Sequence, residues 1–521
     1  MRKASLSLAA LVIIACSSTS EPQVSPDGGA DASAPPVVGK PPLEGVVTTV
    51  ERTLVPTKPR QSSQAGPNPS LPETLDGYLG QGFGEVAPGP GEPHTPRTID
   101  GSTPPAPGAN AKRIVRFVHI PDFQIADDES PTRLGSFDSP PDGPDAALRP
   151  QDPYLCHMAN AAVRTINALH KKDPIAFTLL GGDNADSAQT NEVDWVLGIL
   201  SGADRIKCDS GKDDDLISGP DNDGKDPFKP EGLAMPWKWV TGNHDILVQG
   251  NLRIEDKRSD ALEARSIGGT RHYEEGKKGE VSREDVIPDP RRALLDRKAL
   301  MAKLAAHGDG HGIGEAEKQS GRATYTFDVA GTNLRFFVLD TATENGGAEG
   351  IIRKAEVDRI IKPTLDKAKA DGKWVILSSH HAQSSLSKNG GTFGQEAPDP
   401  VLPDEWATFL GGYTNVIFSM VGHTHAHRIR KVAPTGGHAY WEVMTSAIAD
   451  FPHEFRVVEI FDQDNGWLML RGTCVDYAVD GDPVAAQGRR LGVVDYQSGW
   501  GGAGGLGNKD DRNVELWIKK P

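Results

Sequence analysis

Short apolar runs rich in Val, Ile and Phe recur from about residue 113 onward and alternate with stretches whose apolar residues have helical spacing. The apolar runs are typical of buried strands, which we expect at 113–119, 175–181, 236–241, 334–340, 374–379, 415–422, 440–445 and 455–461. Helices are expected at 157–171, 190–201, 290–306 and 354–370, the last interrupted by Pro363. Strands alternate with helices early and follow one another later, and this order predicts an α/β fold with mixed sheets.

The N-terminus has a different pattern, MRKASLSLAALVIIACSS, in which basic residues precede an apolar run at 6–15. This run is too short to span a bilayer and is typical of an export signal. Its end resembles a bacterial lipobox, so residues 1–16 are expected to be a signal peptide with a lipid-modified Cys16, and ordinary cleavage nearby is the alternative. Because Ser17 stands where an aspartate would favour the inner membrane, we expect an exported lipoprotein of the outer membrane or cell surface, or otherwise a periplasmic or secreted protein.

The rest of the chain divides by composition. Residues 17–43 contain almost no large apolar side chains, cannot offset the entropy of ordering, and are predicted to be a disordered tether. Residues 44–112 combine a strand-like stretch, GVVTTVERTLVP, with turn and loop material, GEVAPGPGEPHTP, and are expected to pack irregularly on the core. The main domain is expected at 113–475, with an insertion at 246–323 near its functional site. The Gly-rich extension 476–521 is predicted to be a loop and an edge strand.

The charge balance argues against nucleic acid as a partner. The chain has 56 Lys plus Arg against 72 Asp plus Glu, a formal net charge of -16, and no basic stripe follows one segment. Affinity for duplex nucleic acid comes largely from clustered positive charge, so no such binding is expected.

Three cysteines remain after Cys16, and their spacing forms no metal motif. In an oxidising compartment one disulfide between Cys156 and Cys208 is possible, with Cys474 free. Three buried thiols are an equally good interpretation.

Five polar clusters come directly after predicted strands, where an α/β fold places its ligand-binding crevice. In chain order they are Asp122-Phe123-Gln124, Gly182-Asp183-Asn184-Ala185-Asp186, Gly242-Asn243-His244-Asp245, His380-His381 and Gly422-His423-Thr424-His425. Each alone is usually a turn, a cap or a surface pair, but five in order at strand exits indicate a site. Hydrolysis of a phosphate ester at neutral pH needs a hydroxide, which two cations about 3.5 to 4 Å apart can generate while they clamp the phosphoryl oxygens.

Such a pair of cations needs a bridging carboxylate together with nitrogen and oxygen ligands. Asp183 is the natural bridge, because Gly182 lets the backbone turn sharply out of its strand. His423 and His425, separated by one residue on an extended segment, can each meet a different cation. Asn243 is a further ligand candidate. The sequence therefore predicts a dinuclear metal centre.

The third cluster also offers a proton donor. His244 follows Asn243 and would point into the same pocket, where a protonated imidazole can assist the departing alkoxide. Asp245 could hold that imidazole in orientation.

From about residue 113 to 461 these motifs resemble those of the calcineurin-like metallophosphoesterase superfamily, whose pattern is D-x-H, GD-x-x-D, GNH-D/E, a His after a strand, and GH-x-H. The resemblance implies a four-layer α/β/β/α sandwich of two mixed sheets and a centre of two metal ions, Mn, Fe or Zn. It implies one metal held by Asp122, Asp183 and His425, and a second held by Asp183, Asn243, His380 and His423. It also makes His244 the acid or transition-state stabiliser and places His381 outside the ligand set.

The first motif departs from the family pattern, because Gln124 stands where the family has histidine. A neutral amide oxygen is a poorer ligand for Zn or Fe but is acceptable to harder cations such as Mn. Gln124 could coordinate through its oxygen, could lie behind a water that takes its place, or could leave only one metal tightly held. A bacterial subgroup of the superfamily has a similar D-x-Q followed by an acidic stretch and Ser-Pro, like DDESP here. Asp186 replaces the tyrosine of purple acid phosphatases, so Fe-phenolate chemistry is not expected.

These features predict a metal-dependent hydrolase that cleaves a monoester or diester of a small phosphorylated substrate, with attack by a metal-generated hydroxide. One alternative is a non-catalytic surface lipoprotein that kept the metallophosphoesterase fold and lost its chemistry through Gln124. A nucleic-acid-directed phosphodiesterase would need a positive groove that the composition disfavours.

Overall fold

The computed structural model describes residues 37–521 apart from 64, 134–146, 256–269 and 272–283. The predicted signal peptide, Cys16 and most of the predicted tether therefore lie outside the described residues. Among the residues that are described, no helix combines the length and the apolar character needed to cross a bilayer.

A seven-stranded mixed sheet carries the first three polar clusters. Its strand order is β3 (Thr95–Thr98), β17 (Val514–Lys519), β16 (Trp467–Asp476), β15 (Glu454–Asp462), β4 (Lys112–Ile120), β5 (Thr178–Leu180) and β6 (Trp237–Lys238). Strands β4, β5 and β6 run parallel, whereas β15 is antiparallel to both β4 and β16. The parallel strands β4 and β5 are joined through helix α2 (Leu155–Lys172), as a parallel pair requires.

A six-stranded mixed sheet carries the last two clusters. Its strand order is β13 (Arg428–Val432), β14 (Tyr440–Met444), β12 (Val416–Val421), β11 (Trp374–Ser378), β10 (Leu334–Val338) and β9 (Tyr325–Asp328). The inner four strands are parallel and nearly all their residues are buried, while β9 and β13 are antiparallel edges. The predicted fold class, α/β with two mixed sheets, is confirmed.

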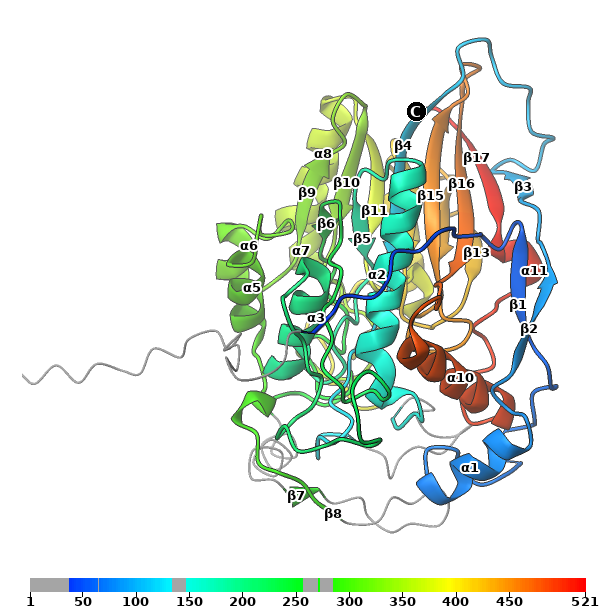
Figure 1. Ribbon diagram of the computed structural model, residues 1–521. Coiled ribbons are helices and arrows are strands. Elements are labelled where there is room, and N and C mark those ends of the chain that lie inside the picture. The colour runs from blue at the N-terminus through cyan, green and yellow to red at the C-terminus, as the bar shows by residue number, and fades with distance from the viewer. Residues whose placement is uncertain (1–36, 64, 134–146, 256–269, 272–283) are drawn as a thin grey trace, which may run out of the picture. The chain divides into compact units, whose positions relative to one another are not determined.

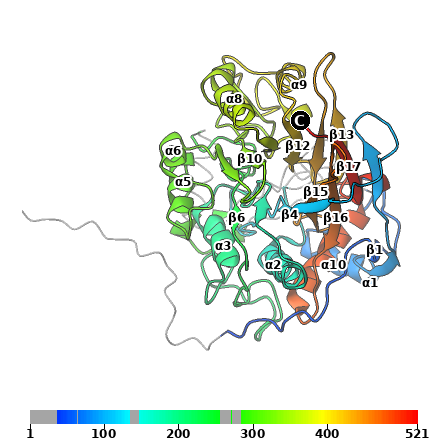
Figure 2. The same ribbon diagram turned by 90° about the horizontal axis from the view of Figure 1, so that it is seen from above.

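The two sheets pack face to face between helices (Figures 1 and 2). The ring of Phe117 in β4 lies 5.2 Å from that of Phe336 in β10, and Trp441 Nε1 donates to the carbonyl of Trp517 across the sheets at 3.1 Å. Helices α8 (Lys362–Ala370) and α9 (Pro403–Leu410) pack against the six-stranded sheet, and α2 and α10 (Pro483–Ser498) lie on the opposite side. These are the four layers that the resemblance implied.

Further helices and two small sheets lie around this sandwich. They are helices α1 (Pro72–Gly80), α3 (Thr190–Ser201), α5 (Arg297–Ala305), α6 (Glu315–Ser320), α7 (Lys354–Glu356) and α11 (Lys509–Arg512), and the two-stranded sheets β1 (Arg52–Pro56) with β2 (Val86–Pro90) and β7 (Thr270–Arg271) with β8 (Glu284–Asp285).

Two sequence predictions about these elements are wrong, and one is confirmed. The extension 476–521 is not a loop with an edge strand: it contains the long helix α10, and β17 is paired on both sides, with β16 and β3. The stretch assigned to turns and loops at 84–96 contains β2, paired with β1. The interruption expected at Pro363 is present: α7 ends at Glu356, a π-helical turn spans Val357–Ile361, and Pro363 lies in the first turn of α8, where its missing N–H costs little.

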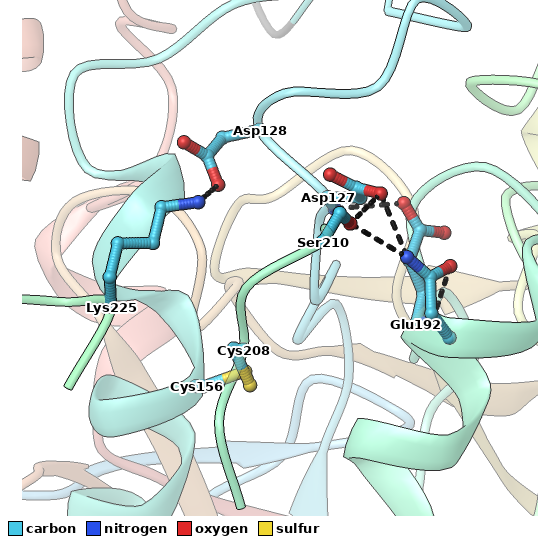
Figure 3. Close-up of a disulfide and its surroundings, with 8 residues drawn as sticks. Asp127, Asp128, Cys156, Glu192, Cys208, Ser210 and Lys225 are labelled. Carbon is cyan, nitrogen blue, oxygen red and sulfur yellow. Dashed lines mark hydrogen bonds and ion pairs between the residues drawn. A yellow bond between two sulfur atoms is a disulfide. The ribbon is translucent and has the colours of Figure 1, made fainter. Parts of the chain in front are cut away.

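A disulfide joins Cys156 in α2 to Cys208 in the loop after α3 (Figure 3), and Cys474 is a buried free thiol. Of the two alternatives, the single disulfide is therefore present. It fixes the loop after α3 to the helix that connects β4 with β5.

The acidic segment directly after the first cluster is held by partners from that loop and from α3 (Figure 3). Ser210, two residues beyond the disulfide, donates its hydroxyl to Asp127 Oδ2. The backbone N–H of Asp127 donates to Glu192 Oε1 at 3.0 Å, and Lys225 Nζ lies 2.7 Å from Asp128 Oδ1. The segment thus has a fixed position relative to the strand exit that carries Asp122 and Gln124.

Candidate metal centre

The loops at the strand exits are hydrogen-bonded to one another through their backbones. The N–H of Asp122 donates to the carbonyl of Gly182 and the N–H of Gln124 to that of Asp183, both at 2.9 Å. The N–H of Gly422 donates to the carbonyl of His380, also at 2.9 Å. The structure therefore brings the predicted clusters of each sheet together at the ends of their strands.

Left-handed backbone is concentrated at these loops. Five predicted site residues have positive φ: Asp122 (56°), Gln124 (42°), Asp183 (52°), His423 (80°) and His425 (50°). A non-glycine residue rarely adopts this conformation, and each instance costs about 1 to 3 kcal/mol. Such strain persists only where the surroundings enforce it, and its concentration here indicates a functional site.

Two ligand oxygens at this site are buried without a hydrogen-bond partner among the described residues. They are Asp122 Oδ1 and Asn243 Oδ1. The amide nitrogen of Asn243 donates to the carbonyl of Gly250 at 3.0 Å, which identifies the other atom as the oxygen and fixes its direction. An unpaired buried polar atom costs about 1 to 3 kcal/mol, so both oxygens fit a bound cation well.

His380 presents its Nε2 to two carboxylates. Its Nδ1 donates to the carbonyl of Gly181 at 2.9 Å, and Nε2 lies 3.0 Å from Asp183 Oδ2 and 3.9 Å from Asp122 Oδ1. Burial alone would lower the pKa of His380, but Asp183 and Asp122 outweigh it and raise that pKa to about 9. The proton on Nε2 uses the same lone pair that would coordinate a metal ion, and it lies where that ion would lie.

His425 also presents its Nε2 to Asp122 Oδ1. Its Nδ1 lies 2.5 Å from Asp450 Oδ2, and its Nε2 lies 3.5 Å from Asp122 Oδ1. His423 donates its backbone N–H to Asp122 Oδ2 at 3.2 Å, and its ring lies 5.2 Å from that of His380. All the predicted nitrogen ligands therefore surround the two aspartates.

His381 has ligand spacing to His380 and His423 but no nitrogen to offer a metal. Its Nε2 donates to the carbonyl of Ala348 at 2.9 Å, and its Nδ1 lies 2.9 Å from the hydroxyl of Thr341. Both ring nitrogens are thus engaged, and the ring of His381 packs against those of His380 and His423, with centroids 5.0 and 4.6 Å away.

His244 lies at the edge of the centre with its imidazole oriented by Asp186. Its Nδ1 donates to the carbonyl of Asp186 at 2.8 Å and lies 3.4 Å from the carboxylate Oδ1 of the same residue. Burial opposes protonation of His244, but the negative charges of Asp183 and Asp186 outweigh it and raise the pKa of the ring. These two carboxylates therefore favour the protonated form of the imidazole.

Asp245 does not orient this imidazole, and that prediction is wrong. Its carboxylate accepts backbone N–H groups of Asn184, Ala185 and Gly242 at 2.8 to 3.0 Å. Asp245 therefore ties the second and third clusters together, and Asp186 has the role expected of Asp245.

Gln124 faces an arginine that sequence reasoning missed. Its Oε1 accepts a hydrogen bond from Arg149, a buried side chain whose Nε lies 2.8 Å from Asp450 Oδ1. Because a guanidinium only donates, this contact fixes the amide oxygen toward Arg149. No signal in the sequence marks Arg149. Asp450 follows strand β14, so a search for polar residues after the predicted strands could have found it.

An open cleft of about 230 Å³ lies over the centre. Its lining includes Gln124, Asp183, Asn243, His244, His423 and His425. The predicted insertion reaches the site at its beginning, where a side chain at Gly250 would collide with His244 and Asn243.

No protein-family model matches the chain, and no curated protein matches it. Among solved structures it is similar to a dimetal phosphatase from Danio rerio, with 11% identity and a TM-score of 0.37 over 70% of this chain and 100% of that one. It is also similar to a purple acid phosphatase, PPD1, from yellow lupin seeds (13% identity, 74% of this chain, 54% of that one, TM-score 0.29). A third is the sulfate thiohydrolase SoxB from Thermus thermophilus (12% identity, 75% of this chain, 60% of that one, TM-score 0.28).

The chain thus spans all of the first of these proteins and little more than half of the other two. At these identities and TM-scores the likeness carries no argument about chemistry. What the chain does must follow from the contacts of its own metal centre.

Proposed function

We propose that this protein hydrolyses an ester bond of a small phosphorylated substrate at a centre of two divalent metal ions. The observation that carries the proposal is the pair of buried oxygens, Asp122 Oδ1 and Asn243 Oδ1, which have no hydrogen-bond partner among the described residues. Asp122 clusters with Asp183 and His380, and Asn243 lines the open cleft together with Asp183. This donor set suits Mn, Fe or Zn.

Asp122, Asp183 and His425 would hold one ion, and Asp183, Asn243, His380 and His423 the other. When bound, the two ions supply a nucleophile from water at neutral pH and neutralise the phosphoryl oxygens. Hydrogen bonds to other residues hold these ligands in place: Gly181 orients His380, Gly250 orients Asn243, and Asp450 orients His425.

His244 acts as the general acid. Its Nδ1–H is committed to the carbonyl of Asp186, so Nε2 is the nitrogen that can donate a proton to the departing alcohol oxygen. Its backbone N–H also donates to Asp183 Oδ1 at 2.8 Å, which couples its position to the bridging carboxylate.

Gln124 stands outside the ligand set in this proposal. The hydrogen bond from Arg149 to its oxygen supports that interpretation over direct coordination. Gln124 and Asp450 then share Arg149 as a common partner, and the arginine holds both side chains beside the site of the first ion.

Membership of the calcineurin-like superfamily, and of its bacterial subgroup with D-x-Q, belongs to the same proposal. So do export and a lipid anchor on Cys16, which rest on the N-terminal sequence alone.

The test is metal analysis of the purified protein together with turnover of p-nitrophenyl phosphate and bis-p-nitrophenyl phosphate, with and without added Mn. We expect two equivalents of metal and hydrolysis of at least one ester, and the preferred ester decides between monoesterase and diesterase. Two bound metals with neither ester hydrolysed would favour the non-catalytic lipoprotein. Fewer than two metals under every condition would refute the dinuclear centre.

A further inference from the structure

The carboxylate of Asp186, which orients the imidazole of His244, is itself held by Arg133, a residue outside the five polar clusters. Asp186 Oδ2 accepts from Arg133 Nη1 at 2.8 Å, and Asp186 Oδ1 lies 3.4 Å from His244 Nδ1. Arg133 Nη2 also donates to the carbonyl of Ala147 at 3.2 Å, so the guanidinium has an anchor besides Asp186. Because one carboxylate oxygen is paired with the guanidinium, the other is directed to the imidazole.

Asp450 has the same arrangement beside His425. Its Oδ2 lies 2.5 Å from His425 Nδ1, and its Oδ1 lies 2.8 Å from Arg149 Nε. Each of the two orienting carboxylates therefore has one oxygen on an imidazole of the proposed centre and the other on an arginine.

Asp152 joins the two arginines. Its Oδ2 accepts from Arg133 Nη2 and from the backbone N–H of Arg149, the latter at 2.9 Å. Its Oδ1 lies 3.5 Å from Arg149 Nη1. The contacts thus form one continuous series in which carboxylates and guanidiniums alternate between two imidazoles: His244, Asp186, Arg133, Asp152, Arg149, Asp450 and His425.

The middle of this series is buried. The side chains of both arginines, of Asp152 and of Asp186 are at most 1% exposed. Replacing a whole buried ion pair with apolar side chains of similar volume is often neutral or stabilising, so such pairs are weak evidence for a role in stability. Stability alone therefore does not account for a series of buried charges that ends on two imidazoles of the proposed centre.

We propose that Arg133 and Asp152 are positioning residues of the active site. Arg133 directs the carboxylate that orients the general acid, and Asp152 joins Arg133 to Arg149, so that one buried series holds both the acid and a ligand of the first metal ion. The inference rests on the proposed function, because it takes His244 as the acid and His425 as the ligand.

Two measurements on the Mn-loaded full chain report on the two ends of the series separately. A general acid matters most for a poor leaving group, because p-nitrophenolate departs with little help from a proton whereas phenolate needs one. The ratio of kcat for p-nitrophenyl phosphate to kcat for phenyl phosphate, or for the corresponding diesters, therefore reports on the position of the acid. Equilibrium dialysis against Mn reports on the metal sites.

Three variants should affect these measurements differently. Arg133→Lys keeps the charge but loses the planar fork, so it cannot bridge two carboxylates with the same geometry. We expect its kcat for phenyl phosphate to fall about tenfold more than that for the p-nitrophenyl ester, with Mn affinity unchanged. Arg149→Lys should bind one Mn about tenfold more weakly and keep the ratio at saturating Mn. Asp152→Asn removes the shared partner and should show both effects.

Arg292→Lys is the matched control. Arg292 is equally buried and also bridges two carboxylates, with Nε 2.9 Å from Asp127 Oδ2 and Nη2 3.2 Å from Glu129 Oε2, in the acidic segment that precedes Arg133. Its ion pairs among the described residues are with that segment and not with the series. Arg292→Lys should therefore leave both the ratio and the Mn affinity at wild-type values.

The proposal fails if Arg133→Lys keeps the wild-type ratio, if Asp152→Asn changes neither quantity, or if Arg292→Lys changes them as much as the other variants do. Thermal unfolding shows which variants are folded. If Arg133→Lys is not, Asp152→Asn, which keeps both arginines, decides.

The wild type separates this inference from the proposed function. Two bound Mn with neither ester hydrolysed would refute the proposed function, and the dialysis of Asp152→Asn would still decide about the series: an unchanged Mn affinity would overturn it. Hydrolysis by the wild type together with an unchanged ratio in Arg133→Lys would refute the positioning role and leave the proposed function in place.

Discussion

Asp450 contacts His425, a predicted ligand of the first metal ion, although it belongs to none of the sequence motifs. Its Oδ2 accepts from His425 Nδ1 at 2.5 Å, and its Oδ1 lies 2.8 Å from Arg149 Nε. Asp450→Asn keeps the size of the side chain. An amide NH2 facing Nδ1–H would place two donors together, so the imidazole would take the other tautomer and lose the Nε2 lone pair that a metal needs.

Changes to such supporting residues typically cost 10- to 100-fold in metal affinity, which corresponds to about 1.4 to 2.7 kcal/mol. We expect Asp450→Asn to weaken one of the two metal sites by this factor and to leave the other occupied. Excess Mn should therefore restore much of the lost activity. Equilibrium dialysis against a series of Mn concentrations, followed by elemental analysis, measures both sites in the same sample.

Asp482→Asn is the matched control. Asp482 is also a buried carboxylate beside an arginine, with Oδ2 3.5 Å from Arg164 Nη1, and it caps α10 by accepting from the backbone N–H of Ala485 at 3.1 Å. It lies outside the cleft lining and contacts no predicted ligand. If Asp450→Asn binds two Mn as tightly as the wild type, or if both variants lose metal equally, the reasoning from the tautomer fails.

Further outcomes follow from the proposed metal centre and from the disulfide. His244→Ala should lower kcat by about 10²- to 10⁴-fold with both metals retained, and loss of metal in this variant would contradict its role as an acid. Asp183→Asn should reduce the occupancy of both metal sites. Gln124→Ala should keep two equivalents of metal, and loss of one equivalent in this variant would show that the Gln124 amide is a ligand. Replacing Cys156 and Cys208 together by serine should lower the free energy of unfolding by about 2 to 4 kcal/mol in urea titrations, and an unchanged midpoint would count against the disulfide. Removing metal with a chelator should lower Tm and adding Mn should restore it, because ligands that bind only the folded state stabilise it; a Tm indifferent to metal would speak against a structured centre.

Sequence alone predicted mixed sheets and most of the candidate ligands, and the family resemblance added that there are two sheets. The apolar runs that predicted β4, β11 and β12 are buried strands. The polar residues after β11 and β12 converge because these parallel strands end at the same edge of one sheet, whereas Asp122 follows β4 in the other sheet and meets them because the two sheets pack face to face. Local pattern is sufficient there: Asp122, His380 and His423 each lie at the exit of the strand that the pattern marks.

The contacts that orient these ligands were decided only by the tertiary structure. Arg149 reaches both Gln124 and Asp450, which lie in segments far apart in the chain, and the sequence near it gives no sign of this. Asp245 and Asp186 are equally plausible partners for His244 by position, and only the loop geometry shows that Asp186 contacts the ring. The Gly-rich extension resembled a surface loop because glycines carry no hydrophobic pattern, yet it supplies a sheet strand and a wall of the cleft. Sequence therefore predicted which side chains could bind a metal. The tertiary contacts decided how those side chains are oriented and which residues contact them, because these contacts join residues that are far apart in the chain.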